Sequence, residues 1–178
     1  SKFNDVDTVY SDEAYTKILN NSTSYISNNL QEIDVSAEIQ KVDSLFSDVD
    51  NKFFHDFKRY KFALYQSASS NQKMKSISNN YYLDNEILYN NNAYMDLFNQ
   101  VYDEYFQYFG RTDNGRKIYS DIGKLKSITA LKNTLGNDSI LSNDTLKEFV
   151  ILKCLHDEFY NDKFSRAAML TVLDSLAL

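Results

Sequence analysis

Few residues in this sequence have side chains that commonly perform catalysis or bind metals: the chain of 178 residues contains one cysteine and two histidines. A helical zinc pair would need a second ligand four residues after a histidine. Arg59 follows His55 at that spacing and Tyr160 follows His156, and neither side chain is a zinc ligand. The sequence therefore predicts no metal site.

Two further features near the C-terminus could be read as catalytic. His156 is followed by Asp157 and Glu158, but neighbouring helical positions diverge by about 100°, so these side chains should not converge on one substrate atom. Cys154 belongs to an apolar stripe, whereas a reactive thiolate needs an electropositive, partly exposed setting. We therefore expect Cys154 to be a small buried filler, and we assign no catalytic residue and no cofactor.

Two polar segments resemble ligand-binding loops only in part. SDVDNKFFHDFK opens like a calcium loop, yet Phe53 stands where that loop requires glycine. RTDNGRKIYSD contains an Asn-Gly turn signal beside basic residues, without a glycine-rich phosphate cradle. The segment from Gly110 to Lys126 is nevertheless rich in glycine and charge, so a protein or peptide partner is expected to bind near it. The candidate contact residues are Phe106, Tyr108, Arg111, Asn114 and Arg116.

The composition limits the kinds of partner. Asp and Glu number 25 against 19 Lys and Arg, a net charge of -6, which argues against nucleic acid because phosphates demand a clustered positive surface. The segment FKRYKF carries Lys58, Arg59 and Lys61, which point in different directions on a helix and are interpreted as solvated charges. No apolar run approaches the roughly 20 residues of a transmembrane helix.

The pattern of apolar residues predicts an all-α bundle of six or seven helices. The chain has no proline, and its four glycines all lie between residues 110 and 136, so the first 109 residues lack the strongest helix breakers. One long helix is expected near residues 36–65, with Ser36 at its start. Its apolar stripe would contain Ile39, Val42, Leu45, Phe46, Val49, Phe53, Phe57, Tyr60 and Leu64.

An aromatic helix is predicted from Asn92 to Phe109. It would begin at a cap from Asn91 or Asn92 and end at Gly110 in the left-handed conformation. Polar residues fill one half of its circumference without an apolar intruder, so the aromatic half is expected to pack against neighbours instead of displaying rings to a ligand. That half contains Tyr94, Met95, Leu97, Phe98, Val101, Tyr102, Tyr105, Phe106, Tyr108 and Phe109, with Phe106 and Tyr108 at edges that should reach solvent.

The remaining helices are shorter. We expect one at residues 127–135 that stops at Gly136, and one that starts at Ser142 and has two apolar faces. A last helix should begin near Ser165, and short helical segments are expected at residues 74–81 and 12–30. We divide the chain into an N-terminal segment, residues 1–35, and a helical bundle domain, residues 36–178.

Two stretches resemble a known protein family. EILYNNNAYMDLFNQVYDEYF (residues 86–106) and LSNDTLKEFVILKCLHDEFYNDKFSRAAMLTVLDSL (residues 141–176) are similar to the helical region that precedes the redox domain in TlpA-like thiol-disulfide oxidoreductases of the thioredoxin superfamily. The resemblance implies a periplasmic or cell-envelope protein in which this segment is an accessory domain. The chain departs from the family because it lacks the CxxC pair, so no catalytic residue is carried over.

Two functional hypotheses follow. The first is a non-catalytic helical interaction domain, an excerpt of a larger thioredoxin-like protein with a covalently linked downstream redox domain. The chain starts without methionine and stops in mid-pattern at TVLDSLAL, which agrees with that expectation. The alternative is a helical carbohydrate- or peptide-binding module that uses surface tyrosines, since the chain contains 14 of them.

Overall fold

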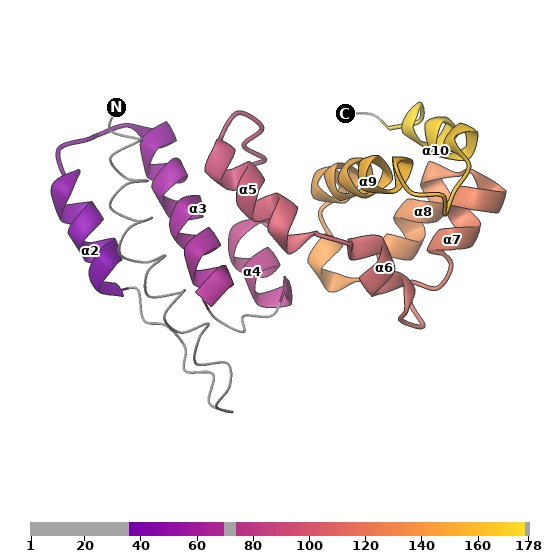
Figure 1. Ribbon diagram of the computed structural model, residues 1–178, viewed down its shortest axis with the longest axis horizontal. Coiled ribbons are helices and arrows are strands. Elements are labelled where there is room, and N and C mark those ends of the chain that lie inside the picture. Colours follow the sequence, from indigo (N-terminus) through magenta and orange to yellow (C-terminus); the bar gives the residue numbers. More distant parts are fainter. Residues whose placement is uncertain (1–35, 70–73, 177–178) are drawn as a thin grey trace. The chain divides into compact units, whose positions relative to one another are not determined.

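The computed structural model describes residues 36–69 and 74–176, and within these ranges every regular element is helical (Figure 1). The all-α prediction is confirmed, whereas the predicted segment 1–35 and its helix at 12–30 lie outside the described residues. None of the described helices is long and apolar enough to cross a membrane.

The elements are α2 (Ser36–Leu45), α3 (Lys52–Ser69), α4 (Met74–Tyr81), α5 (Asn92–Val101), α6 (Tyr105–Gly110), α7 (Ile118–Ser120), the π-helical turn η2 (Asp121–Leu125), α8 (Ile128–Leu135), the 3-10 turn η3 (Ser139–Leu141), α9 (Asp144–Phe159) and α10 (Arg166–Leu173).

The described residues form two compact units. The first contains α2, α3 and residues 88–98, and the second contains residues 74–87 and 99–176. Helix α5 therefore starts in the first unit and ends in the second. Each unit is described separately below.

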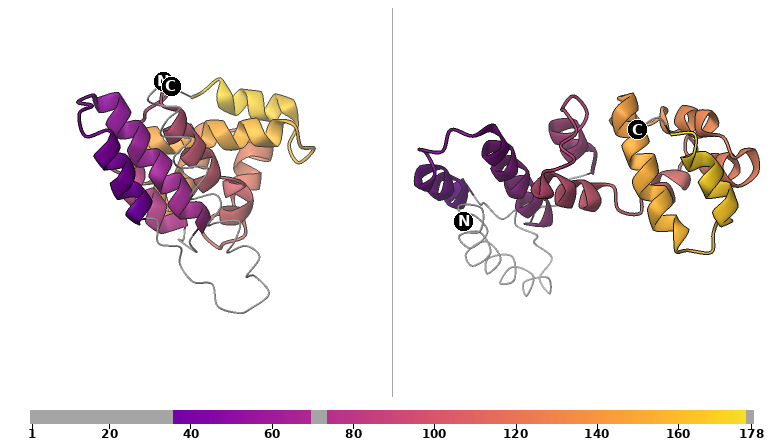
Figure 2. Two further views of the ribbon diagram at one scale, coloured as in Figure 1. Left: turned by 60° about the vertical axis from the view of Figure 1, so that its left-hand side comes forward. Right: turned by 90° about the horizontal axis from the view of Figure 1, so that it is seen from above.

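In the first unit α2 and α3 lie side by side, as both Figure 1 and Figure 2 show. The predicted single helix over residues 36–65 is wrong, because residues 46–51 leave the helical conformation. The side-chain Oδ1 of Asn51 accepts a hydrogen bond from the Phe54 backbone N–H at 3.1 Å. Asn51 thus caps a new helix, as expected for an asparagine whose side chain competes for backbone donors.

The interruption between α2 and α3 changes which aromatic residue of α3 faces the core. Phe54 is buried and its ring makes an edge contact with Phe46 at 5.5 Å, while Phe53 is 45% exposed. Leu45, expected in the apolar stripe, is also exposed. Phe57 and Tyr60, which lie further along α3 in the same predicted stripe, are buried as expected. The stripe prediction therefore fails at the two positions next to the interruption, Leu45 and Phe53.

Lys58 corrects a second expectation in this unit. It was interpreted as a solvated charge, yet it is buried and its Nζ lies 2.6 Å from Asp43 Oδ1 on α2. The ammonium also lies over the Phe54 ring at 5.6 Å. The aliphatic stem of a lysine can cover apolar surface while its charge meets a carboxylate at the edge, and here that carboxylate is 55% exposed.

The aromatic helix of the sequence prediction is a bent helix in the structure. It runs as α5, bends at residues 102–104 and continues as α6. Asn91 caps its start by accepting the Tyr94 backbone N–H, as predicted. The prediction that Gly110 ends it in a left-handed conformation is wrong, because the backbone N–H of Arg111 continues the right-handed turn by bonding Tyr108 and Phe109. The left-handed residue lies instead at the bend, where Glu104 has φ 48°.

Packing explains most of the aromatic residues, as the sequence predicted. Tyr94, Phe98 and Tyr105 are at most 1% exposed. In the first unit Tyr94 makes an edge contact with Tyr60 at 4.8 Å and stacks on Phe98. In the second unit a row of ring contacts joins Tyr82, Tyr102, Tyr105 and Phe109.

A buried polar network accompanies the rings in the second unit. The hydroxyls of Tyr102 and Ser78 are 2.6 Å apart, and Tyr105 donates to Asp138 at 2.9 Å. Burial raises the pKa of both tyrosines, and the Asp138 carboxylate raises that of Tyr105 further. These phenols are therefore neutral structural groups, and each hydroxyl has its own hydrogen-bond partner, Ser78 for Tyr102 and Asp138 for Tyr105.

The C-terminal helices follow the predicted caps with one shift. Ser127 caps α8 and Ser165 caps α10, so both helices begin next to the residues at which the sequence predicted their start. Helix α9 is capped by Asn143 instead of the predicted Ser142, because the Asn143 side chain accepts the Leu146 backbone N–H at 2.9 Å. The two apolar faces predicted for α9 are largely buried, although Leu152 is 37% exposed. Figure 2 shows α10 alongside α9.

Candidate functional site

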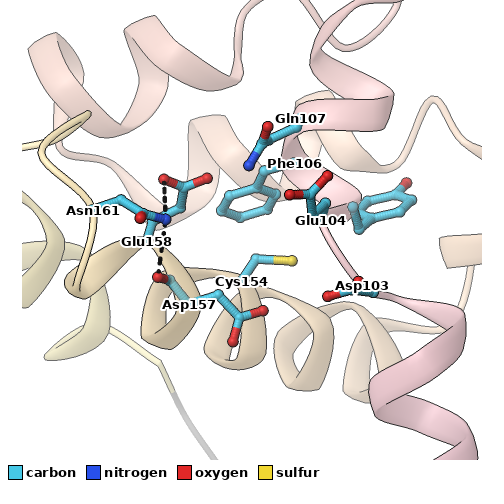
Figure 3. A pocket seen from close by; sticks show the side chains of 9 residues that line it. Asp103, Glu104, Phe106, Gln107, Cys154, Asp157, Glu158 and Asn161 are labelled. Carbon is cyan, nitrogen blue, oxygen red and sulfur yellow. Dashed lines mark hydrogen bonds between the residues drawn. The ribbon is translucent and has the colours of Figure 1, made fainter.

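A small pocket in the second unit lies between α6 and the C-terminal half of α9 (Figure 3). Its volume is about 190 Å³, below the roughly 300 Å³ at which pockets for drug-sized ligands begin. The pocket therefore has room for one side chain or a small fragment, and it is too small for a nucleotide or flavin. Its lining consists of Asp103, Glu104, Tyr105, Phe106, Gln107, Cys154, Asp157, Glu158 and Asn161.

The bend between α5 and α6 positions one wall of this pocket. Glu104 adopts the left-handed conformation there, and its backbone carbonyl accepts hydrogen bonds from the N–H groups of Gln107 and Tyr108. This turn aims the start of α6 toward α9. As a result, the Phe106 ring lies beside Cys154 in Figure 3.

The pocket is acidic, but part of that charge is already neutralised. Four of its lining residues are carboxylates and none is basic. On α9, Asp157 forms an ion pair with Lys153 at 2.5 Å, and the buried Glu158 lies 3.4 Å from Lys163. Among the described residues no group of three His, Cys, Asp or Glu side chains is arranged to hold a metal ion.

Cys154 contributes a thiol that is 3% exposed. Burial raises the pKa of Cys154 to about 12, and the neighbouring Asp157 and Glu158 act in the same direction. The protonated thiol is therefore the form that this environment favours at neutral pH. The predicted burial of Cys154 is confirmed, and burial of this kind disfavours the thiolate, which is the nucleophilic form.

The histidines do not form a catalytic arrangement with these groups. His156 is 70% exposed, its ring makes an edge contact with Tyr160, and its Nδ1 lies 3.5 Å from Asp157. Glu158 is buried and paired with Lys163. The expected divergence therefore holds for His156 and Glu158, whereas His156 and Asp157 lie close together at the surface. His55 is exposed on α3 in the first unit.

The structure separates the predicted partner-contact residues into two sets. Tyr108 is 58% exposed, and Arg111, Asn114 and Arg116 are exposed in the loop between α6 and α7. Phe106 is only 2% exposed, so the expectation that it reaches solvent is wrong. The bend at residues 102–104 explains the difference, because it turns the start of α6 toward α9 and buries a ring that a straight helix would leave at the edge.

The loop between α6 and α7 is well bonded. Thr112 Oγ1 donates to the Phe109 carbonyl at 2.7 Å and accepts the Gly115 backbone N–H at 3.1 Å. The Arg116 backbone N–H bonds the Thr112 carbonyl at 3.0 Å. The loop is thus a defined turn that presents its polar side chains outward.

Sequence reasoning did not identify the pocket as a site. Asp103, Glu104 and Gln107 are polar residues within the predicted aromatic helix, but nothing in their spacing indicates the bend that places them opposite α9. A left-handed glutamate has no strong sequence signal, since glycine and asparagine are the residues that favour this conformation.

Comparisons with protein-family models, with curated proteins and with solved structures find no significant match to the chain.

Proposed function

We propose that this chain is a non-catalytic helical interaction domain of a larger, envelope-located protein whose covalently linked downstream domain is thioredoxin-like and carries the redox chemistry. The link to TlpA-like oxidoreductases and the periplasmic location rest on the sequence resemblance of residues 86–106 and 141–176. A protein or peptide is the expected partner, and nucleic acid is not.

The state of Cys154 is the observation that carries the non-catalytic part of the proposal. The thiol is 3% exposed and the pKa of Cys154 is raised to about 12, while two of the nearby carboxylates are paired with lysines. A disulfide-exchange enzyme needs an accessible thiolate with a lowered pKa and a second cysteine. This chain supplies neither, so redox activity would have to come from another domain.

The complete coding sequence tests the proposed context. We expect a CxxC pair at a strand–helix junction within about 150 residues after Leu178. A complete coding sequence without such a pair would contradict the thioredoxin-like assignment.

A dithiol-oxidation assay tests the absence of catalysis independently. The chain and its Cys154→Ala variant should show the same background rate with a small-molecule disulfide as oxidant. A rate that is clearly above background in the chain and lost in the variant would show that Cys154 is catalytic.

The alternative of a carbohydrate- or peptide-binding module retains one supporting observation. Four tyrosines, Tyr89, Tyr108, Tyr119 and Tyr160, are between 41% and 76% exposed. A glycan and peptide screen followed by tyrosine fluorescence would favour this alternative if glycans shift the emission at low ligand concentration. We expect no glycan response, because Tyr94, Phe98 and Tyr105, the centre of the aromatic helix, are buried.

A further inference from the structure

Basic side chains are exposed together in the loop that connects α6 and α7, which Figure 1 shows as a turn extending beyond both helices. Arg111, Arg116 and Lys117 are all exposed, and Asp113 is the acidic residue among them. Asp113 lies 3.9 Å from Arg116, with both side chains more than 70% exposed, so the pair is weak and solvent-screened. In a chain of net charge -6, this loop is locally positive.

Hydrogen bonds within the chain hold the backbone of the loop without a partner. Thr112 ties the turn to the end of α6 through both its side chain and its carbonyl. Gly115 is buried, and a Cβ atom added there would lie 2.1 Å from the Phe109 carbonyl oxygen. The loop therefore folds tightly against α6, and little ordering entropy remains to be lost when a partner binds.

Two exposed tyrosines flank these charges. Tyr108 on the last turn of α6 is 58% exposed, and Tyr119 on α7 is 41% exposed. The Tyr119 ring lies close to Gly110, where a Cβ atom would be 3.0 Å from its Cε2. Tyrosine and arginine are the residue types that most often dominate binding energy at protein interfaces.

We infer that this surface binds a carboxylate-rich segment of a partner protein. The loop surface is defined here as Tyr108, Arg111, Asn114, Arg116, Lys117 and Tyr119. The inference deepens the proposed function, on which it rests, by naming where the partner binds and what chemistry it offers. Each guanidinium can pair with a carboxylate through two hydrogen bonds, and the tyrosine rings can cover apolar side chains between the acids.

The number of basic residues in the loop favours an acidic protein segment over other polyanions as the partner. Membrane-binding basic clusters usually hold about 4–8 Lys or Arg residues, whereas this loop holds three. Nucleic-acid binding typically neutralises about 6–10 phosphates, and the net charge of -6 opposes it. A peptide with a few carboxylates demands only the cations that the loop provides.

A peptide titration tests the inference. The probe is a fluorescein-labelled synthetic peptide of alternating glutamate and phenylalanine, and anisotropy is measured with the whole chain at low and at physiological salt. Arg116→Gln and Arg111→Gln should each weaken binding up to about fivefold, the loss expected for one solvent-exposed ion pair. Asp113→Asn should strengthen binding, because it removes the acidic residue beside Arg116.

Lys75→Gln is the matched control, because Lys75 is an exposed lysine on α4 in the same unit and its loss changes the net charge by the same amount. Binding that is unchanged in this variant and weakened in the arginine variants would support the loop surface. Equal weakening in all three variants would overturn it, since net charge alone would then explain binding.

The other polyanions are separate arms of the same titration. Tighter binding to vesicles that contain phosphatidylglycerol, or to a single-stranded oligonucleotide, than to the peptide would also overturn the inference. None of these results bears on the CxxC search or on the dithiol assay, so failure of the loop surface and failure of the proposed function can be told apart.

Discussion

At the residue scale, the side chains with raised pKa values are buried, whereas both histidines are exposed. Cys154 is buried in the wall of a small acidic pocket, and Tyr102 and Tyr105 are buried phenols bonded to Ser78 and Asp138. The raised pKa values of these groups follow from desolvation before any other cause. Each therefore stabilises the fold only while it keeps its proton.

The thiol of Cys154 makes stability depend on alkaline pH. In the unfolded chain it loses its proton near pH 9, whereas the folded protein holds it to about pH 12. Above pH 9 the unfolded state binds fewer protons, so the free energy of unfolding falls as the pH rises through this window. Between pH 9 and 10 we expect the chain to lose about 1 kcal/mol more stability than Cys154→Ala.

Urea unfolding at a series of pH values measures this difference. The range stops at pH 10 because Tyr102 and Tyr105, whose pKa values are also raised, contribute above it. Parallel pH profiles for the chain and for Cys154→Ala would contradict the assigned burial of the thiol.

Two glycines offer a matched test of local packing. A Cβ at Gly115 would overlap the Phe109 carbonyl, whereas a Cβ at Gly123 would meet nothing within 4 Å. Gly115→Ala should therefore destabilise the protein by about 2 kcal/mol or more, as overpacking does. Gly123→Ala should be neutral or stabilise it by up to about 1 kcal/mol, through a smaller entropy loss on folding. Thermal unfolding of both variants measures the two changes in stability. A comparable loss of stability in both would be inconsistent with the described turn at Gly115.

At the element scale the sequence predicted which segments are helical better than where helices break. The caps at Asn91, Ser127 and Ser165 were predictable because serine and asparagine side chains accept the first free backbone N–H groups. The turn between α2 and α3 was missed, although Asp48, Asp50 and Asn51 supplied a capping signal, because the apolar residues continue across it at nearly helical spacing. Next to that break, Phe54 is buried in place of Phe53, the residue that the pattern predicted for the core.

The candidate site was predicted less completely than the helices. Arg111, Asn114 and Arg116 belong to the glycine-rich, charged segment, and all three are exposed. Of the two rings predicted at the edges of the apolar half, Tyr108 is exposed and Phe106 is buried. The pocket was not predicted, because it depends on the bend at Glu104 and on the approach of α9, two tertiary features that periodicity does not encode.

The start of α3 can be tested at Asn51. Its side chain accepts the Phe54 backbone N–H, so Asn51→Ala should cost about 1 kcal/mol of stability, the usual value for a lost N-cap. Asn99→Ala is the control, since Asn99 is exposed within α5 and should change stability by less than about 0.5 kcal/mol. Both are measured by chemical denaturation, and an unaffected Asn51→Ala variant would argue against the new helix start.

At the scale of the whole molecule, aromatic side chains fill the interior of each described unit, and buried charges such as Lys58 and Glu158 are held in ion pairs. Each unit has its own ring contacts, from Tyr60 and Tyr94 in the first to Tyr102 and Tyr105 in the second. Because most of the described rings are buried in this way, few of them can contact a ligand. This agrees with the proposal of an interaction domain that binds its partner through surface residues. The locally positive loop between α6 and α7 is the part of that surface on which we place the partner.

The central claim is that the rings of the aromatic helix, with the exception of the exposed Tyr108, pack the fold and are not displayed to a ligand. It is tested most directly by measuring the free energy of unfolding of Phe98→Ala beside that of Asp103→Ala. Phe98 is 1% exposed and Asp103 is exposed, so the first variant should lose about 3–5 kcal/mol and the second less than about 0.5 kcal/mol. Equal losses at the two positions would contradict the account.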